Sequence, residues 1–216
     1  MKEKKKLNQN TFLLLVTILL FFVMYAIGCV LFNAQGFAKT QNFLNLFISN
    51  AGLIVIGIGM TIVMITGGID ISVGSVTALV CMVMADLMEN KGVSAYVAVL
   101  AALLIGLAFG IVQGFLVTYM GIQPFIVTLA GMFFARGMTS IVHTDPFNVQ
   151  NEAFVKLKDT RVIVPGMGSV NRIGKYVNAY VEIGVIVAIL IVVIMFVMLR
   201  WTKLGRSFYA VGGNRQ

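Results

Sequence analysis

The sequence predicts an all-α protein: a polytopic membrane bundle of about six transmembrane helices. Of its 216 residues, 59% are hydrophobic and only 11% are charged, whereas roughly a quarter of the residues in soluble domains are charged. Several apolar runs reach the roughly 20 residues that cross a hydrocarbon core about 30 Å thick. These runs are continuous rather than alternating, which favours helices over the strands of a closed barrel.

The first two spans follow a basic N-terminal tail. The N-terminal tail, residues 1–10, contains four lysines and predicts a cytoplasmic N-terminus, because positive charge favours the cytoplasmic side of a membrane. The first span is expected over residues 11–32, and the short polar segment 33–42 should face outside. The second span, 43–66, then returns inward.

The third apolar run, residues 73–88, is short for a full span and follows the glycine-rich stretch TGGIDISVGS at 66–75. Two adjacent glycines weaken a helix, so this stretch is expected to form a broken or re-entrant element. A fourth span at 93–119 and a fifth at 125–142 complete the transmembrane block 11–142. In the fourth span, glycines four residues apart predict close packing of a neighbouring helix: Gly106, Gly110 and Gly114.

The chain then turns polar before a last span. Residues 143–178 carry charges of both signs and are expected to form an extracytoplasmic subdomain. The sixth span is expected at 179–199, followed by the basic segment 200–216, which marks a cytoplasmic end. The formal net charge of +8 is therefore interpreted as membrane topology, not as a nucleic-acid-binding surface.

Motifs for enzymatic chemistry are missing from the sequence. The nearest approach to a Walker A pattern, at Gly174 and Lys175, has Ser169 in place of the first glycine and Tyr176 in place of the hydroxyl residue. His143 is the only histidine, and no cluster has metal-ligand spacing. No nucleophile elbow occurs. We therefore expect that the chain is not an enzyme and that it binds neither a cofactor nor a metal.

Three charged residues lie in or near apolar runs, where burying an ion costs at least about 2.5 to 3.5 kcal/mol at a helix centre. Asp86 lies close to the polar turn at Glu89 and is interpreted as an interface residue. Arg136 either reaches the outer surface or faces a transport pathway. Asp70, with Ser72, either caps the helix that follows or lines a transport cavity.

Three stretches in order resemble one known family: GGIDISVGS, IQPFIVTLAGMFFARG and TKLGRSFYAVGGNRQ. Together they are similar to the permease subunits of bacterial ABC importers for monosaccharides, in the ribose-type branch. The resemblance covers essentially the whole chain. The sequence around GFAKT and TLAGMFFARG looks most similar to that of the galactofuranose-type permeases.

The resemblance implies a location and a set of partners. Permeases of this group lie in the bacterial cytoplasmic (inner) membrane, in contact with membrane lipid. They pair with a second permease subunit, identical or paralogous, and receive sugar from an extracytoplasmic sugar-binding protein. Two ATP-binding cassette ATPase subunits, or one duplicated ATPase, drive transport. Family members usually have about ten membrane helices, so we expect this chain to be a truncated reading frame or an incomplete record.

The resemblance also assigns the last segment to ATPase coupling. The positions carried over from the family's cytoplasmic docking loop are Gly205, Arg206, Tyr209, Gly212, Gly213 and Asn214. Without the family, a lipid-headgroup anchor is the alternative interpretation of this basic and aromatic segment.

A sugar pathway needs hydrogen-bonding groups and aromatic faces in a mostly apolar wall. The expected substrate-path residues are Asp70, Ser72, Gln113, Phe125, Thr128 and Arg136. Two other functions stay open. In one, an ion-coupled secondary carrier or channel uses Asp70 or Asp86 to take up a proton or sodium. In the other, the chain is a membrane scaffold that transports nothing.

Overall fold

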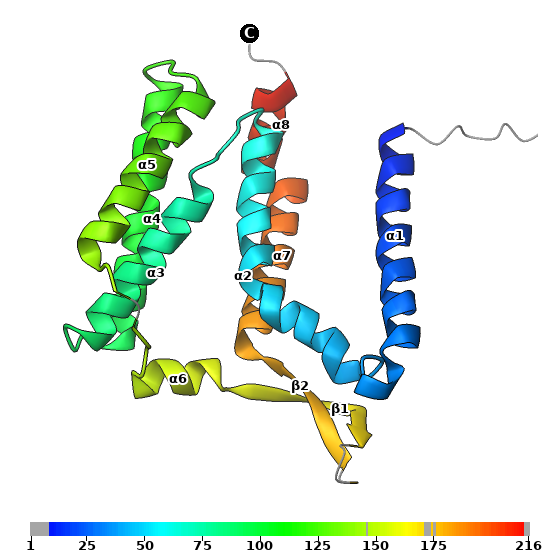
Figure 1. The fold of residues 1–216 in the computed structure, drawn as a ribbon. Coiled ribbons are helices and arrows are strands. Elements are labelled where there is room, and N and C mark those ends of the chain that lie inside the picture. The colour runs from blue at the N-terminus through cyan, green and yellow to red at the C-terminus, as the bar shows by residue number, and fades with distance from the viewer. Residues whose placement is uncertain (1–8, 146, 171–173, 175, 214–216) are drawn as a thin grey trace, which may run out of the picture. The chain divides into compact units, whose positions relative to one another are not determined.

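The computed structural model describes residues 9–145, 147–170, 174 and 176–213, and it is mostly helical (Figure 1). The elements, in chain order, are α1 (Gln9–Leu31), the 3-10 helix η1 (Asn33–Gln35), α2 (Thr40–Ile65), α3 (Val73–Glu89), α4 (Ala95–Thr118), α5 (Pro124–Val142), α6 (Glu152–Lys158), β1 (Arg161–Val170), β2 (Tyr176–Glu182), α7 (Ile183–Trp201) and α8 (Lys203–Gly213).

Five helices in the described part of the chain are long and apolar enough to cross a membrane: α1, α2, α4, α5 and α7. The prediction of a helical, polytopic membrane protein is confirmed. The run expected as a third span forms α3, which has 17 residues. At about 1.5 Å per residue it measures about 25 Å, less than the roughly 30 Å of a hydrocarbon core.

The chain divides into two compact units. The first takes in residues 1–49 and 162–181, and the second takes in residues 50–161 and 182–216. Within the polar segment 143–178, α6 belongs to the second unit and most of β1 to the first. The last membrane helix begins at Ile183, later than predicted, because the residues before it belong to β2.

In the first unit, the hairpin of β1 and β2 forms a two-stranded sheet that the sequence did not predict. The side-chain amide of Gln41, near the start of α2, pairs with the backbone of β2: its Oε1 accepts from the Tyr180 N–H (2.8 Å) and its Nε2 donates to the Tyr180 carbonyl (3.2 Å). The Lys39 ammonium donates to the Val170 carbonyl at the end of β1 (3.1 Å). Both strands are therefore joined to the segment that starts α2.

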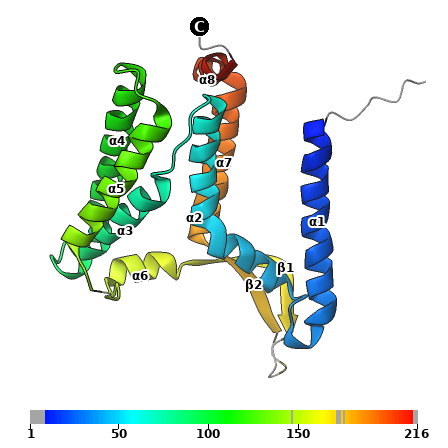
Figure 2. The same ribbon diagram turned by 45° about the horizontal axis from the view of Figure 1, so that its top comes forward.

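In the second unit, α3, α4 and α5 pack together (Figures 1 and 2). Pro124 stands at the start of α5, where its missing N–H would be unpaired in any case. At the polar end of α3, the Glu89 carboxylate accepts backbone N–H bonds from Gln150 (2.7 Å) and Asn151 (2.8 Å). These bonds join the chain before α6 to the end of α3.

The helices α7 and α8 meet at a sharp turn. Thr202 lies between them, and its hydroxyl accepts from the Gly205 N–H (3.2 Å), which is the geometry of a helix N-cap. A Cβ added to Gly205, which is buried, would overlap the backbone of Leu199. Only glycine therefore lets α8 begin so close to the end of α7.

Candidate functional site

The helix break predicted near TGGIDISVGS is present, and its start has a defined geometry. The helix α2 ends at Ile65, and Gly67 adopts a left-handed backbone, with φ of 74°. The Gly67 N–H donates to the Met64 carbonyl (3.0 Å) and the Gly68 N–H to the Val63 carbonyl (2.9 Å). This pair of bonds is a Schellman motif, for which glycine is the favoured residue. Residues 68–72 then run without regular structure into α3.

Asp70 and Ser72 bond to each other inside this break. One carboxylate oxygen of Asp70, Oδ1, accepts from the Ser72 backbone N–H (2.8 Å) and from the Ser72 hydroxyl (2.7 Å). Ser72 is the residue that precedes α3, and its side chain makes no capping bond. The capping prediction is therefore wrong for Ser72, because its hydroxyl is directed at Asp70. Asp70 instead fixes the backbone just before the helix starts.

Side chains of the two neighbouring helices, α4 and α5, form hydrogen bonds to the break. Gln113 of α4 donates from Nε2 to the Ser72 hydroxyl (3.0 Å), so the bonds run in series from the amide through the hydroxyl to the carboxylate. Thr128 of α5 places its hydroxyl at 3.3 Å from the carbonyls of both Ile69 and Phe125. Ser72 is 1% exposed and Thr128 5% exposed. Each of these two buried hydroxyls thus has hydrogen-bond partners, as is usual for buried polar groups.

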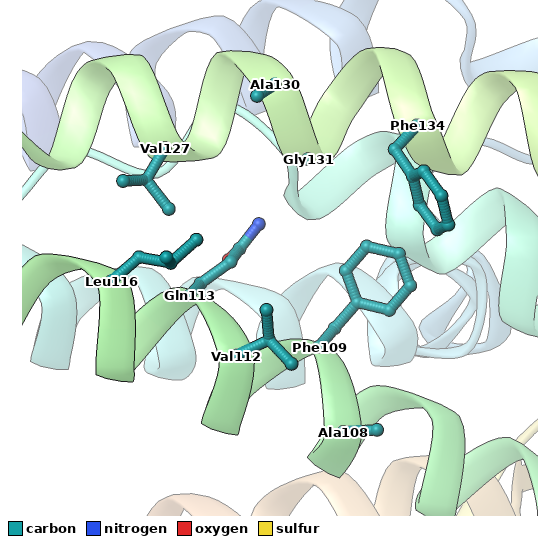
Figure 3. Close-up of a pocket in the computed structure, with 9 residues that line it drawn as sticks. All are labelled: Ala108, Phe109, Val112, Gln113, Leu116, Val127, Ala130, Gly131 and Phe134. Carbon is teal, nitrogen blue, oxygen red and sulfur yellow. The ribbon is translucent and has the colours of Figure 1, made fainter. Parts of the chain in front are cut away.

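Gly131 is a site residue that sequence reasoning missed. In Figure 3 the amide nitrogen of Gln113 points from α4 towards α5 near Gly131, and a Cβ at Gly131 would overlap that nitrogen. The sequence signal was a single glycine in TLAGMFFARG. The predicted stripe behaves differently: among the described residues, an added Cβ meets no atom within 4 Å at any of its glycines, Gly106, Gly110 and Gly114.

Two cavities adjoin this cluster. The smaller, about 160 Å³, is lined by Asp70, Ser72, Thr77 and Gln113 together with Phe109 and the helix faces around them. The larger, about 420 Å³, lies between α4 and α5 and is lined almost wholly by apolar side chains (Figure 3). Gln113 and Phe109 line both cavities. Gln113 therefore stands where a polar cavity and an apolar one meet.

The other two predicted path residues lie outside this cluster. The Arg136 guanidinium donates from Nε to the Ser75 hydroxyl (3.3 Å), so it lies against α3, one turn beyond Ser72, while its side chain stays exposed. Phe125 is 46% exposed and lines neither cavity. The structure thus brings together Asp70, Ser72, Gln113 and Thr128, links Arg136 to the same helix, and leaves Phe125 apart.

Asp86 lies in the last turn of α3 and bonds to the polar turn that follows, so its predicted place at the membrane interface stays a prediction. It is 7% exposed, accepts from the Asn90 amide (2.7 Å) and forms an ion pair with Lys91 (3.4 Å). Within the part of the chain that the structure describes, no group of three or more His, Cys, Asp or Glu side chains could hold a metal ion.

Five of the six residues expected to couple to an ATPase lie on α8. Arg206 and Tyr209 line a cavity of about 270 Å³ with Arg200 and the end of α7. Gly205 and Gly212 make close backbone approaches, whereas an added Cβ at Gly213 would meet no atom within 4 Å among the described residues. Asn214 lies outside the described residues.

The chain is similar to several bacterial sugar permeases. It is 35% identical over 215 residues to the fructose import permease protein FruG of Bifidobacterium longum, covering 99% of this chain and 61% of that protein. It is 35% identical over 201 residues to the inner membrane ABC transporter permease protein YjfF of Escherichia coli (93% and 57%). It is 36% identical over 185 residues to the ribose import permease protein RbsC of Escherichia coli (84% and 53%).

The chain thus spans a little more than half the length of these relatives. No solved structure matches it. The family model described as "Branched-chain amino acid transport system / permease component" matches residues 42–216, which is well over half of the chain. The five membrane-length helices agree with a multi-pass membrane location. The chain belongs to this family of transport-system permease components.

Proposed function

We propose that the chain forms the membrane pathway of an ATP-binding cassette importer that moves a monosaccharide across the bacterial cytoplasmic membrane without changing it chemically. The observation that carries the proposal is the polar cluster of Asp70, Ser72 and Gln113 at a break between membrane helices. Two relatives, a fructose and a ribose import permease, support a sugar as the substrate.

The small cavity offers the two kinds of contact that a sugar uses. Asp70, Ser72, Thr77 and Gln113 present acceptors and donors to it, and sugar hydroxyls both donate and accept hydrogen bonds. Phe109 supplies an aromatic face to the same cavity, the role expected of Phe125 from the sequence. A pathway needs few such groups in an otherwise apolar wall, because binding tight enough to hold the sugar would slow its release.

The partners follow from this function. We propose that two ATPase subunits, or one duplicated ATPase, dock at α8, that an extracytoplasmic sugar-binding protein delivers the substrate, and that a second permease subunit completes the pathway. The exposed side chains of Arg206 and Tyr209 on α8 support docking at that helix. The N-terminus is proposed to be cytoplasmic, because the four lysines of its tail favour that side.

Uptake into membrane vesicles tests the proposal. The chain is co-expressed with the ATPase and the binding protein, and labelled ribose, galactose and fructose are supplied in turn. ATP-dependent uptake of one of these sugars is the expected result. Uptake that requires a proton gradient but no ATP would contradict the proposal. It would favour the second candidate, an ion-coupled carrier, for which an acid between membrane helices, Asp70, is the supporting observation.

The docking assignment has a separate test. The substitution Arg206→Ala should lower the sugar transported per ATP hydrolysed, because it removes a charged side chain at the proposed ATPase contact. Lys203→Ala is the matched control, since Lys203 is an exposed cation on the same helix that does not line the cavity with Arg206. Equal coupling in both variants would count against docking through Arg206.

A further inference from the structure

The far end of α8 approaches the end of α2. A Cβ added to Gly212 would overlap the carbonyl oxygen of Ile65 and would lie 3.4 Å from the Cα of Thr66. Ile65 is the last residue of α2, and Thr66 is the first residue of the helix break. Figures 1 and 2 both show α8 beside this end of α2. Gly212 therefore touches the backbone from which the break starts.

This approach is less forgiving than the close contact at Gly131 in the same unit. At Gly131, the atom in the way is the end of the flexible Gln113 side chain, which can turn aside. At Gly212, the atom in the way belongs to the backbone of Ile65, and it can move only if the end of α2 moves with it. The neighbouring Gly213 would meet no described atom within 4 Å.

The near end of α8 is fixed to a different helix. Gly205 packs on the backbone of Leu199, and Thr202 caps the start of α8. The helix is thus fixed to α7 at its first turn and touches the end of α2 at its last. A tilt of α8 about its first turn towards α2 would press Gly212 on the backbone of Ile65.

The segment after Ile65 is built to transmit such a displacement. Gly67 and Gly68 close a hydrogen-bonded turn onto α2, so the start of the break moves with that helix. Only four residues separate Ile65 from Asp70. Ile69 is bonded to Thr128, and Asp70 is bonded to Ser72. A shift of Ile65 therefore changes the strain on these bonds at the small cavity.

We propose that Gly212 is a positioning residue through which α8 moves the end of α2, and so shifts the Asp70 segment that lines the cavity. This inference rests on the proposed function, in which α8 receives the force of an ATPase. It assigns to Gly212 a contact within the permease, whereas the family resemblance gave it only a place in the docking segment. If this contact is disturbed, ATP hydrolysis should no longer change the conformation of residues 66–72.

The first experiment compares Gly212→Ala with Gly184→Ala in the co-expressed complex. Each substitution adds one methyl group to a helix of the second unit, but only the first meets backbone, because a Cβ at Gly184 in α7 meets no described atom within 4 Å. Gly212→Ala should lower the sugar transported per ATP hydrolysed by at least about fivefold, the lower end of typical coupling between sites. Gly184→Ala should leave this ratio within about twofold of the unmodified complex. Equal ratios in the two variants would overturn the inference.

A second experiment measures the accessibility of the helix break directly and requires no sugar. Both native cysteines, Cys29 and Cys81, are replaced by serine, and Ile69→Cys provides one thiol at a side chain that is 57% exposed. Its rate of alkylation is measured without nucleotide and with ATP and vanadate. We expect the nucleotide to change this rate in the protein that keeps Gly212 and in Gly184→Ala, but not in Gly212→Ala.

The outcomes separate the two proposals. A nucleotide-dependent rate that persists in Gly212→Ala, or that is absent from the Gly212 protein, overturns the role of Gly212. Absence of ATP-dependent uptake for every sugar by the unmodified complex contradicts the proposed sugar transport instead, whatever the thiol probe reports. Purified Gly212→Ala is also compared with Gly184→Ala in thermal unfolding: a lost coupling ratio with an unchanged midpoint supports positioning, and a loss that only parallels unfolding overturns it.

Discussion

The helix α1 and the bundle of α3, α4 and α5 are both strongly apolar, but their polar side chains behave differently. In α1, no described residue is buried, and the Thr17 hydroxyl donates to the Leu13 carbonyl of the same helix (3.0 Å). In the bundle, hydroxyl, amide and carboxylate groups bond across elements, from Gln113 to Ser72 and from Thr128 to Ile69. Apolar composition determines that a helix can lie in a membrane, whereas polar and small residues determine what it packs against.

The largest effect should come from Asp70→Ala. It leaves the N–H and hydroxyl of Ser72 without their acceptor, and Ser72 is 1% exposed. Leaving a buried donor unpaired costs about 1–3 kcal/mol, so the free energy of unfolding should fall by at least that amount and uptake should be lost. Thermal unfolding in detergent and vesicle uptake measure the two effects.

The control for that variant is Asp70→Asn, which keeps an acceptor oxygen for Ser72. If Asp70 acts by holding the break, Asn should retain most of the stability and transport that Ala loses. Equal loss of transport with retained stability would contradict a purely positional role, and would place the charge of Asp70 in contact with the substrate.

A smaller effect than that of Asp70→Ala is expected for Gly131→Ala. The added methyl group would displace the Gln113 amide and break its bond to Ser72, at a cost of about 0.5–1.5 kcal/mol in the free energy of unfolding. Gly137→Ala is the matched control on the same helix, because a Cβ there meets no described atom within 4 Å. If both variants unfold at the same temperature, Gly131 is not needed for the contact between α4 and α5.

A double substitution tests whether Gly131 and Gln113 act through the same hydrogen bond. The change that it adds to the free energy of unfolding is expected to be smaller. Gln113→Leu removes the same bond from the other side. Once Gly131→Ala is present, adding Gln113→Leu should therefore change the free energy of unfolding by less than about 0.5 kcal/mol, although alone it costs about as much as Gly131→Ala. Additive losses would mean that the two residues act through separate contacts.

The sequence predicted the fold class and the helix break because both depend on local composition. Apolar runs of membrane length and two adjacent glycines need no knowledge of neighbouring helices. The short length of α3 could be predicted for the same reason. The hairpin of β1 and β2 was missed, because its strands lie in a polar segment, and bonds from Gln41 and Lys39, far away in the sequence, hold it in place.

The candidate site was predicted less completely. Asp70, Ser72, Gln113 and Thr128 could be named because each is a polar residue in an apolar run. Gly131 could not be singled out, since its role depends on where the Gln113 side chain of another helix lies. The same reasoning favoured the regular stripe that includes Gly106 and Gly110, but spacing on one helix gives no information on whether a neighbour approaches that face.

The smallest effect is predicted for Thr17→Val in α1, and it tests the opening comparison most directly. Valine keeps the shape of threonine, and the lost bond is to the Leu13 carbonyl within the same helix. The free energy of unfolding should change by no more than about 0.5 kcal/mol. Thr128→Val is the counterpart in the bundle. There the lost hydroxyl lies between α5 and the carbonyl of Ile69 in the break, so a cost of about 1–3 kcal/mol is expected. Equal costs would break the comparison, because the partner of a hydroxyl, within its helix or across to another element, would then make no difference to its contribution.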